Sequence, residues 1–124
     1  MGFSVFKADS LAWIDRDDGS GRRVARLSDA MTQMRANVWR YPAGARGKRH
    51  ADRVQEETFV ILTGSPSMLL GDPPERVDLS SGSVVVVQPG TPLQIRNDGD
   101  GEAMLFIVGA PPEQGGADFL PDVD

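Results

Sequence analysis

The sequence predicts an all-β fold, and three observations support this prediction. Short segments rich in β-branched and aromatic residues recur along the chain, as is typical of strands. Glycine and proline turns separate these segments at close spacing. No long segment shows the period of about 3.6 residues that marks an amphipathic helix. The pattern indicates a β-sandwich or a barrel, and turn spacing alone leaves both an immunoglobulin-like sandwich and a jelly roll open.

The clearest expected strand covers residues 32–41, because side chains of different character alternate along it. Its two faces carry Met34, Ala36 and Val38 on one side and Arg35, Asn37, Trp39 and Tyr41 on the other. Further short strands are expected at residues 22–27, 57–63, 65–70, 77–79, 93–96 and 103–108. The consecutive valines of residues 84–87 predict a strand that is buried on both faces or nearly so.

The two ends of the chain give weaker patterns. Residues 1–16 are interpreted as a short edge strand or an ordered arm packed on the body, and residues 27–34 have a weak helical character. The tail, residues 111–124, is rich in proline, glycine and acidic residues and is expected to be loosely ordered. Phe119 and Leu120 could still anchor it to the body or to a partner chain.

Length and charge restrict the function classes. A chain of 124 residues predicts one domain, residues 1–124, with a core that needs no disulfide or metal. The formal net charge of −5 argues against nucleic acid as a partner, because phosphate backbones repel an acidic protein. Basic residues gather once, at Arg40, Arg46, Lys48 and Arg49. We favour a solvated loop with acidic neighbours here, and local attraction for an anionic ligand is the alternative.

The chain contains no cysteine, so disulfides, thiolate nucleophiles and cysteine-ligated metal sites are excluded. Its N-terminus lacks a basic start followed by a long apolar run, which argues against a signal peptide. No stretch approaches about 18 consecutive apolar residues, so no membrane partner is expected. The cytoplasm is the expected location.

The stretch from Gly44 to Gly64 organises the chain. It contains His50, the only histidine, with Asp52 two residues later and Glu57 at the start of the next strand. Residues two apart in an extended chain face the same side, so several polar groups are expected to point into one cavity. The expected pocket residues are His50, Asp52, Glu57, Phe59, Ile61, Leu93 and Ile95. A cavity with one charged corner and apolar walls suits a small organic molecule with a polar end.

Each candidate residue also has an interpretation without function. His50 is either a metal ligand or acid–base group, or a loop histidine paired with Asp52 or Glu57. Glu57 is expected to point inward, and its neighbour Glu56 is expected to be solvated. Aromatic residues that either line the pocket entrance or belong to the core are Trp39, Tyr41 and Phe59. Side chains that could meet an anionic ligand, or have no catalytic role, are Arg40, Gln94 and Arg96.

Two stretches resemble the motifs of the cupin family. Gly44–Gly64 is similar to the first motif, a glycine and a His-x-His followed by a glutamate and a second glycine; the matches are Gly44, His50, Glu57 and Gly64. Gly82–Asn97 is similar to the second motif, and the matches are Gly82, Gly90, Thr91, Pro92 and Asn97. The resemblance covers about residues 32–110. It implies a double-stranded β-helix barrel of the jelly-roll type, and a homodimer formed through edge strands or swapped N-terminal arms.

The resemblance also implies a metal site. In metal-binding cupins, two histidines and a glutamate of the first motif and one histidine of the second motif hold the metal. Here Asp52 replaces one histidine of the first motif, and Leu93 replaces the histidine of the second. With one histidine, the chain cannot build a site of three histidines, nor one of two histidines and a carboxylate. What remains is His50, Asp52 and Glu57, which could hold Zn²⁺, Mn²⁺, Fe²⁺ or Ni²⁺ weakly, or no metal.

Three hypotheses for the function follow, in order of preference. The first is a small-molecule-binding protein with a degenerate or weak metal site, which the replacements at Asp52 and Leu93 favour. The second is a metal-dependent enzyme of the isomerase, lyase or oxygenase type that uses His50, Asp52 and Glu57. The third is a structural or interaction module with a vestigial pocket, which a collapsed barrel interior would favour.

Overall fold

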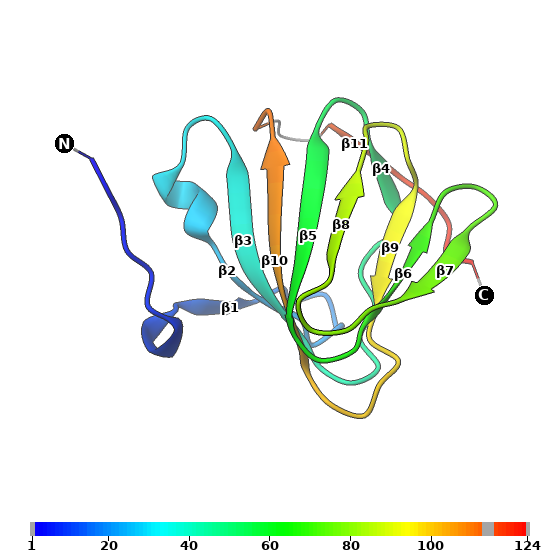
Figure 1. The fold of residues 1–124 in the computed structure, drawn as a ribbon, viewed down its shortest axis with the longest axis horizontal. Coiled ribbons are helices and arrows are strands. Elements are labelled where there is room, and N and C mark those ends of the chain that lie inside the picture. The colour runs from blue at the N-terminus through cyan, green and yellow to red at the C-terminus, as the bar shows by residue number, and fades with distance from the viewer. Residues whose placement is uncertain (1, 113–115, 124) are drawn as a thin grey trace.

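The structure is a computed structural model that describes residues 2–112 and 116–123, and it consists of two antiparallel sheets (Figure 1). The six-stranded sheet has the order β1 (Trp13–Asp15), β2 (Arg23–Ala25), β3 (Arg35–Tyr41), β10 (Ala103–Ala110), β5 (Glu56–Thr63) and β8 (Val84–Val87). The five-stranded sheet has the order β11 (Ala117–Phe119), β4 (His50–Asp52), β9 (Leu93–Arg96), β6 (Ser67–Leu70) and β7 (Glu75–Asp78). The all-β fold predicted from the sequence is confirmed.

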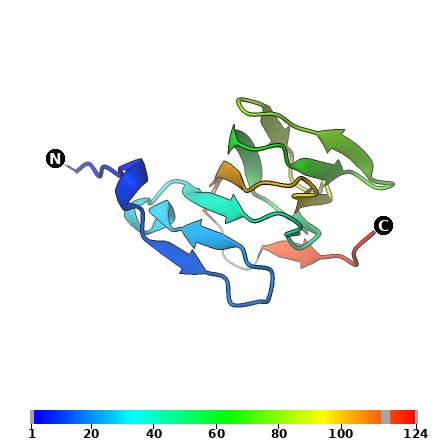
Figure 2. The same cartoon turned by 90° about the horizontal axis from the view of Figure 1, so that it is seen from below.

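Helical structure among the described residues is limited to two short 3-10 helices, η1 (Ala8–Ser10) and η2 (Leu27–Ala30). The second is the only remnant, in this part of the chain, of the helical character expected over residues 27–34. Neither helix has the length or apolar character that would carry it across a bilayer. The first precedes β1, and the two chain ends lie at opposite sides of the molecule in both ribbon views (Figure 2).

The main core lies between the two sheets, where the inward faces of their strands meet. The six-stranded sheet contributes Phe59, Ile61 and Leu105, and the five-stranded sheet contributes Met68, Leu93 and Ile95. These side chains are all at most 4% exposed. Burying one such side chain stabilises the fold by roughly 1.5–3 kcal/mol, so this cluster holds the two sheets together.

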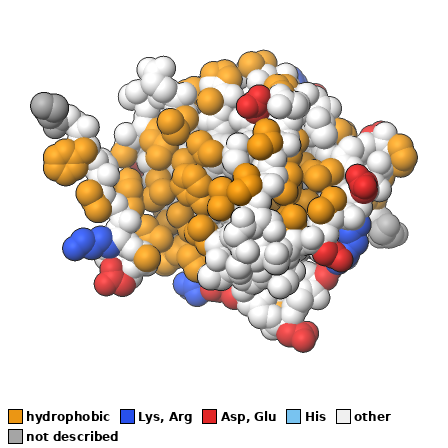
Figure 3. Space-filling view, viewed as in Figure 1, with side chains coloured by type: hydrophobic (Ala, Val, Ile, Leu, Met, Phe, Trp, Pro, Cys, Tyr) orange, Lys and Arg blue, Asp and Glu red, His pale blue; other side chains and the backbone are white. Residues whose placement is uncertain are grey.

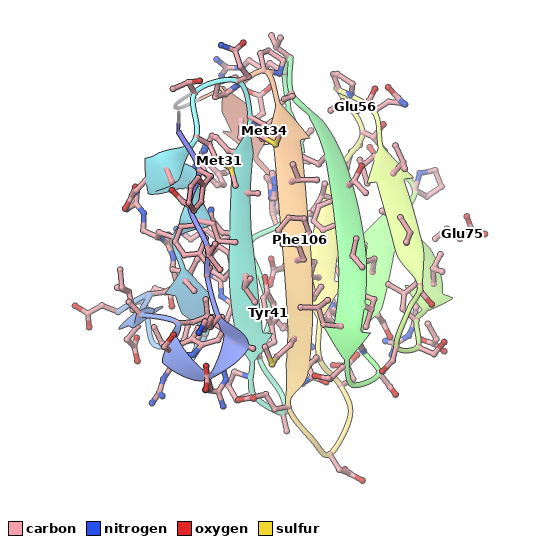
Figure 4. The ribbon with its side chains drawn as sticks, turned by 60° about the vertical axis from the view of Figure 1, so that its left-hand side comes forward. Met31, Met34, Tyr41, Glu56, Glu75 and Phe106 are labelled. Atoms are coloured by element: carbon pink, nitrogen blue, oxygen red, sulfur yellow. The ribbon has the colours of Figure 1, made fainter. Side chains whose placement is uncertain are left out.

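Strand β3 follows the alternation that its sequence predicts. Val38 packs on the outer side of the six-stranded sheet in a second apolar cluster with Leu27, and Phe106 of β10 packs against that cluster (Figure 4). Trp39 and Tyr41 belong instead to the cluster between the sheets. One strand therefore supplies both apolar clusters, because successive side chains point to opposite faces.

The loop that leads from β3 to β4 crosses from one sheet to the other, and Asn97 fixes its course. The Asn97 side-chain amide donates to the carbonyl of Tyr41 at 2.8 Å, and its backbone N–H donates to Ala45 at 2.9 Å. Gly44 donates in return to the Asn97 carbonyl at 2.7 Å. These bonds place the following strand, β4, with His50 directly opposite Leu93 of β9.

The valine run departs from its predicted burial. Val84 and Val86 are 58% and 55% exposed, whereas Val87 is buried, so the prediction of burial on both faces is wrong. Strand β8 lies at the edge of the six-stranded sheet, and no other layer covers its outer side within the described chain. Hydrophobic side chains are accordingly visible over this sheet in the space-filling view (Figure 3).

The described part of the C-terminal tail is ordered against the body, which corrects the expectation of a loose tail. Strand β11 pairs with β4 in antiparallel register, with Phe119 opposite His50. Leu120 donates a backbone hydrogen bond to Arg49, and Arg49 donates through its side chain to the carbonyl of Pro121 at 3.2 Å. Backbone pairing and a buried arginine therefore hold residues 117–121 against the body. Residues 113–115 and 124 of the predicted tail lie outside the described residues.

Two motif glycines allow a matched test of packing. Both have left-handed backbone angles, with φ of +87° at Gly64 and +83° at Gly44. A Cβ atom at Gly64 would lie 2.7 Å from the Glu102 carbonyl oxygen, whereas a Cβ atom at Gly44 would have no neighbour within 4 Å. We expect Gly44→Ala to cost about 1–2 kcal/mol of unfolding free energy, from backbone strain alone. Gly64→Ala should cost about 2–5 kcal/mol, because overpacking adds to that strain.

Urea denaturation of the two glycine variants and the parent measures this difference. Equal losses of unfolding free energy in Gly44→Ala and Gly64→Ala would contradict the close contact at Gly64.

The homodimer stays a prediction, and the exposed valines locate where we expect the contact. An exposed apolar edge strand is unfavourable in water and is commonly covered by another chain. Val84→Glu combined with Val86→Glu is expected to convert a dimer into monomers in light scattering, because the charges would be buried in the contact. Val54→Glu is the control, since Val54 is 51% exposed in the turn between β4 and β5. A monomeric parent protein would contradict the prediction.

Candidate metal centre and cavity

Three titratable side chains from the two sheets converge at one point. His50 and Asp52 lie two residues apart on β4, and Glu57 lies on β5 in the opposite sheet. The His50 Nε2 atom is 3.6 Å from Asp52 Oδ2 and 3.9 Å from Glu57 Oε1. The spacing that suggested these residues in the sequence does bring them together, because β4 and β5 face each other across the interior.

The backbone sets the orientation of the His50 ring. Its Nδ1 atom lies 2.9 Å from the carbonyl oxygen of Lys48, and since a carbonyl only accepts, Nδ1 carries the proton and donates. The other ring nitrogen, Nε2, therefore faces the carboxylates. This is the arrangement in which a histidine can offer a lone pair to a metal, with the second nitrogen held by a backbone carbonyl.

Two oxygen atoms at this point lack hydrogen-bond partners. Asp52 Oδ2 and Glu57 Oε1 are buried and accept no hydrogen bond from the described residues. A buried carboxylate oxygen without a partner is costly, so these atoms are suited to a ligand that bears positive charge. One ligand atom from each of the three side chains lies within 4.8 Å of the others. Two atoms bound about 2.1 Å from one ion lie at most about 4.2 Å apart, so the two His50 distances fit a shared cation.

Burial and mutual attraction shift the pKa of each group. Burial alone would lower the pKa of His50, but the carboxylates of Asp52 and Glu57 and the Lys48 carbonyl raise it to about 10. Burial raises the pKa of Glu57 to about 7, and the neighbouring Asp52 adds to the rise. Burial alone would raise the pKa of Asp52, but the attraction of the His50 imidazolium outweighs burial and keeps the pKa of Asp52 below its usual value. At 3.6 and 3.9 Å these contacts are longer than hydrogen bonds, so the attraction is electrostatic.

A cavity of about 300 Å³ adjoins the three side chains. Of the expected pocket residues, those that line it are His50, Asp52, Glu57, Phe59, Leu93 and Ile95. Ile61 does not line it and is 1% exposed in the core between the sheets. The three candidate entrance aromatics, Trp39, Tyr41 and Phe59, all line the cavity as well as contacting the core. His50, Asp52 and Glu57 thus form one charged corner of the cavity, and Phe59, Leu93 and Ile95 form an apolar part of its wall.

Several lining residues were not expected from the sequence. These are Arg16, Arg22, Arg35, Asn37, Gly47, Lys48, Gln55, Ile107, Gly109, Ala117 and Phe119. Arg35 and Asn37 share the β3 face of Trp39 and Tyr41, so the alternation contained a signal for them. Ile107 and Gly109 come from strand β10, and the others come from turns, loops and the tail, where no periodicity indicates which way a side chain points.

The remaining candidates lie elsewhere. Arg40 forms an ion pair with Glu102 at 2.8 Å, away from the cavity lining. Gln94 is buried and donates to the Gly47 carbonyl at 2.9 Å, while Arg96 is buried and donates to Gln94 and to the carbonyl of Val123. Glu56 is exposed, as expected.

The sequence comparison establishes the family. Residues 37–109 match the family model described as Cupin domain, which is more than half of the chain. The chain therefore belongs to the cupin family, as its two motifs suggested. A search among curated proteins found no match.

Solved structures share the fold at low sequence identity. KdgF from Halomonas sp. is 18% identical, with a TM-score of 0.76 over 89% of this chain and 96% of that one. A sugar phosphate isomerase of the cupin superfamily from Silicibacter pomeroyi is 20% identical, with a TM-score of 0.76 over 94% and 92%. The polyketide cyclase RemF from Streptomyces resistomycificus is 12% identical, with a TM-score of 0.84 over 99% and 89%. These likenesses support a double-stranded β-helix fold.

The charge at His50 predicts how stability depends on pH in metal-free protein. A folded-state pKa of about 10 is above the unfolded value, so protonated His50 stabilises the fold fully below about pH 6.5. This contribution is lost as the pH rises towards 10. We therefore expect the unfolding free energy of parent protein in chelator to exceed that of His50→Gln more at pH 6 than at pH 9.5. A difference that is constant or grows with pH would contradict the ion pairing.

Proposed function

We propose that this cupin binds a divalent cation through His50, Asp52 and Glu57 and a small polar organic molecule in the adjoining cavity. The observation that carries the proposal is the pair of buried carboxylate oxygens without partners, both within 4 Å of the same imidazole nitrogen. Either a protonated His50 or a metal ion can compensate the negative charge of these two oxygens. Metal affinity should therefore fall as the pH is lowered.

The ligand set has one nitrogen and two carboxylates, which suits Zn²⁺ or Mn²⁺. Three protein ligands leave coordination positions open, as is usual at sites where a small molecule also binds. Leu93 lies directly opposite His50 and is an apolar wall at the position of the second-motif histidine. An ion held there would act as a Lewis acid on an oxygen of the bound molecule. The two protein carboxylates and the imidazole would set its position.

An open cavity also counts against a vestigial pocket. The interior keeps a volume of about 300 Å³ beside the three titratable groups. Ligand pockets in proteins begin at about this size. The apolar residues Phe59, Leu93 and Ile95 line the wall and can contact the non-polar part of a ligand.

A metal-dependent enzyme of the isomerase or lyase type is the second candidate. The observation that favours it is that Asp52 and Glu57 both line the cavity, with oxygens that can accept a proton from a bound molecule. Removal of either carboxylate would then abolish turnover, whereas a binding protein would show no turnover to lose.

Elemental analysis of protein purified without chelator and without a histidine tag tests the metal site. We expect close to one metal ion per chain in the parent protein, and its loss in His50→Ala and Glu57→Ala. Glu56→Ala is the matched control and should retain the metal, because Glu56 is adjacent but exposed. Added metal at about one hundred times its dissociation constant should raise the unfolding free energy of the parent by about 2.7 kcal/mol and leave His50→Ala unchanged.

Absence of metal in all samples would contradict the metal site. The soaks that decide this use Mn²⁺, Fe²⁺, Ni²⁺ and Zn²⁺ in turn.

A further inference from the structure

The cavity is lined by more cationic side chains than carboxylates, although the protein as a whole is acidic. The formal net charge of the protein is −5, yet four cationic side chains line this one cavity. They are Arg16, Arg22, Arg35 and Lys48, and they come from four separate segments of the chain. Such convergence in an acidic protein creates a local field that attracts anions.

Arg22 is the buried anchor of this group. Its guanidinium donates to Asp18 at 2.8 Å, to Ser20 at 3.0 Å and to the Tyr41 hydroxyl at 3.3 Å, and the residue is 6% exposed. Each nitrogen therefore has a partner, so Arg22 positions its neighbours and is not the group that meets a ligand. Its guanidinium carbon also lies 5.4 Å from the centre of the Trp39 ring.

Arg16 also packs against the Trp39 ring, and it has no carboxylate partner among the described residues. Its guanidinium carbon lies 5.8 Å from the centre of the Trp39 ring, and both side chains line the cavity. The residue is exposed, so the cation faces solvent at the mouth. Stacking on an aromatic ring holds an arginine in place without neutralising its charge.

Lys48 is placed in the same way in the loop that precedes β4, a strand of the opposite sheet. Its Nζ atom lies 5.6 Å from the centre of the Phe119 ring, and Phe119 lies opposite His50 in the strand pairing. Lys48 is exposed and, within the part of the chain that the structure describes, has no carboxylate partner. Two cations supported by aromatic rings, one from each side, therefore flank the cavity.

The carboxylates inside the cavity do not cancel this charge. The charge of Asp52 and Glu57 is opposed by His50 at close range, and a divalent cation would compensate both. The cations at the mouth are thus left to act on the ligand. Along β3, Trp39 and Tyr41 follow Asn37 by two and four residues. They therefore lie about 7–13 Å from Asn37 along the cavity wall.

We propose that the molecule bound in this cavity is a small organic anion, whose carboxylate or phosphate group lies between Arg16 and Lys48. Its body would extend along the apolar wall towards His50, Asp52 and Glu57. This inference deepens the proposed function and rests on it for the cavity, but the anion site does not require the metal.

Titration calorimetry with gluconate, glucose 6-phosphate and glucose tests the charge requirement and its source. Glucose is the neutral reference, and the two anions distinguish a carboxylate from a phosphate. We expect at least one anion to bind at least roughly tenfold tighter than glucose, and to bind more weakly as the salt concentration rises. Arg16→Gln combined with Lys48→Gln should weaken that anion roughly tenfold or more.

The control is Arg23→Gln combined with Arg26→Gln, which removes the same charge from exposed positions outside the cavity lining. It should bind the anion like the parent protein. Equal binding of glucose, no binding of either anion, or equal losses in the two double variants would overturn the proposal.

Measurements of metal content distinguish a failure of the anion site from a failure of the proposed metal site. The Arg16/Lys48 variant should keep the metal of the parent protein, and the titrations are repeated in chelator. Anion binding that persists without metal supports the anion site even where the metal site fails. Loss of anion binding in His50→Ala alone, with no effect of the Arg16/Lys48 variant, would overturn the anion site and leave the metal site standing.

Discussion

Two carboxylates enclosed between the sheets place a constraint on the rest of the structure. A charge removed from water is strongly unfavourable unless an opposite charge or hydrogen bonds compensate it. Among the described residues, His50 is the group that faces both Asp52 and Glu57, at 3.6 and 3.9 Å. Strand β4 must therefore cross to the second sheet with its polar face inward. The hydrogen bonds of Asn97 to the preceding loop, and the pairing of β4 with the tail strand β11, both stabilise that position.

Much of this arrangement could be predicted from short stretches of the sequence. Strand periodicity placed Trp39 and Tyr41 together on one face of β3, and in the structure both contact the core between the sheets. The same parity put His50 and Asp52 on one face, and the motif spacing selected Glu57 over the exposed Glu56. These features are predictable because each depends on a few neighbouring residues. The side chains of a strand alternate between its two faces regardless of what packs against the strand.

Other features depend on contacts between distant segments, and the sequence does not encode these as a local pattern. A valine run looks the same in a central strand and at an edge, so the exposure of Val84 and Val86 follows only from the strand order. The pairing of β11 with β4 uses backbone groups, which every residue has, and a composition rich in proline and glycine hides it. Arg16 and Lys48 sit in a turn and a loop, where their direction depends on the rings of Trp39 and Phe119.

The proposed metal site and the proposed anion site are related electrostatically. Exchanging a histidine for Asp52 adds a negative charge, whereas Leu93 removes a neutral nitrogen ligand and leaves the charge unchanged. A divalent ion held by Asp52, Glu57 and one neutral imidazole would form a centre with no net charge. Such a centre offers an anion little long-range attraction, because Coulomb forces act on net charge at distance. The attraction must then come from outside the centre, and the stacked cations at the cavity mouth are positioned to supply it.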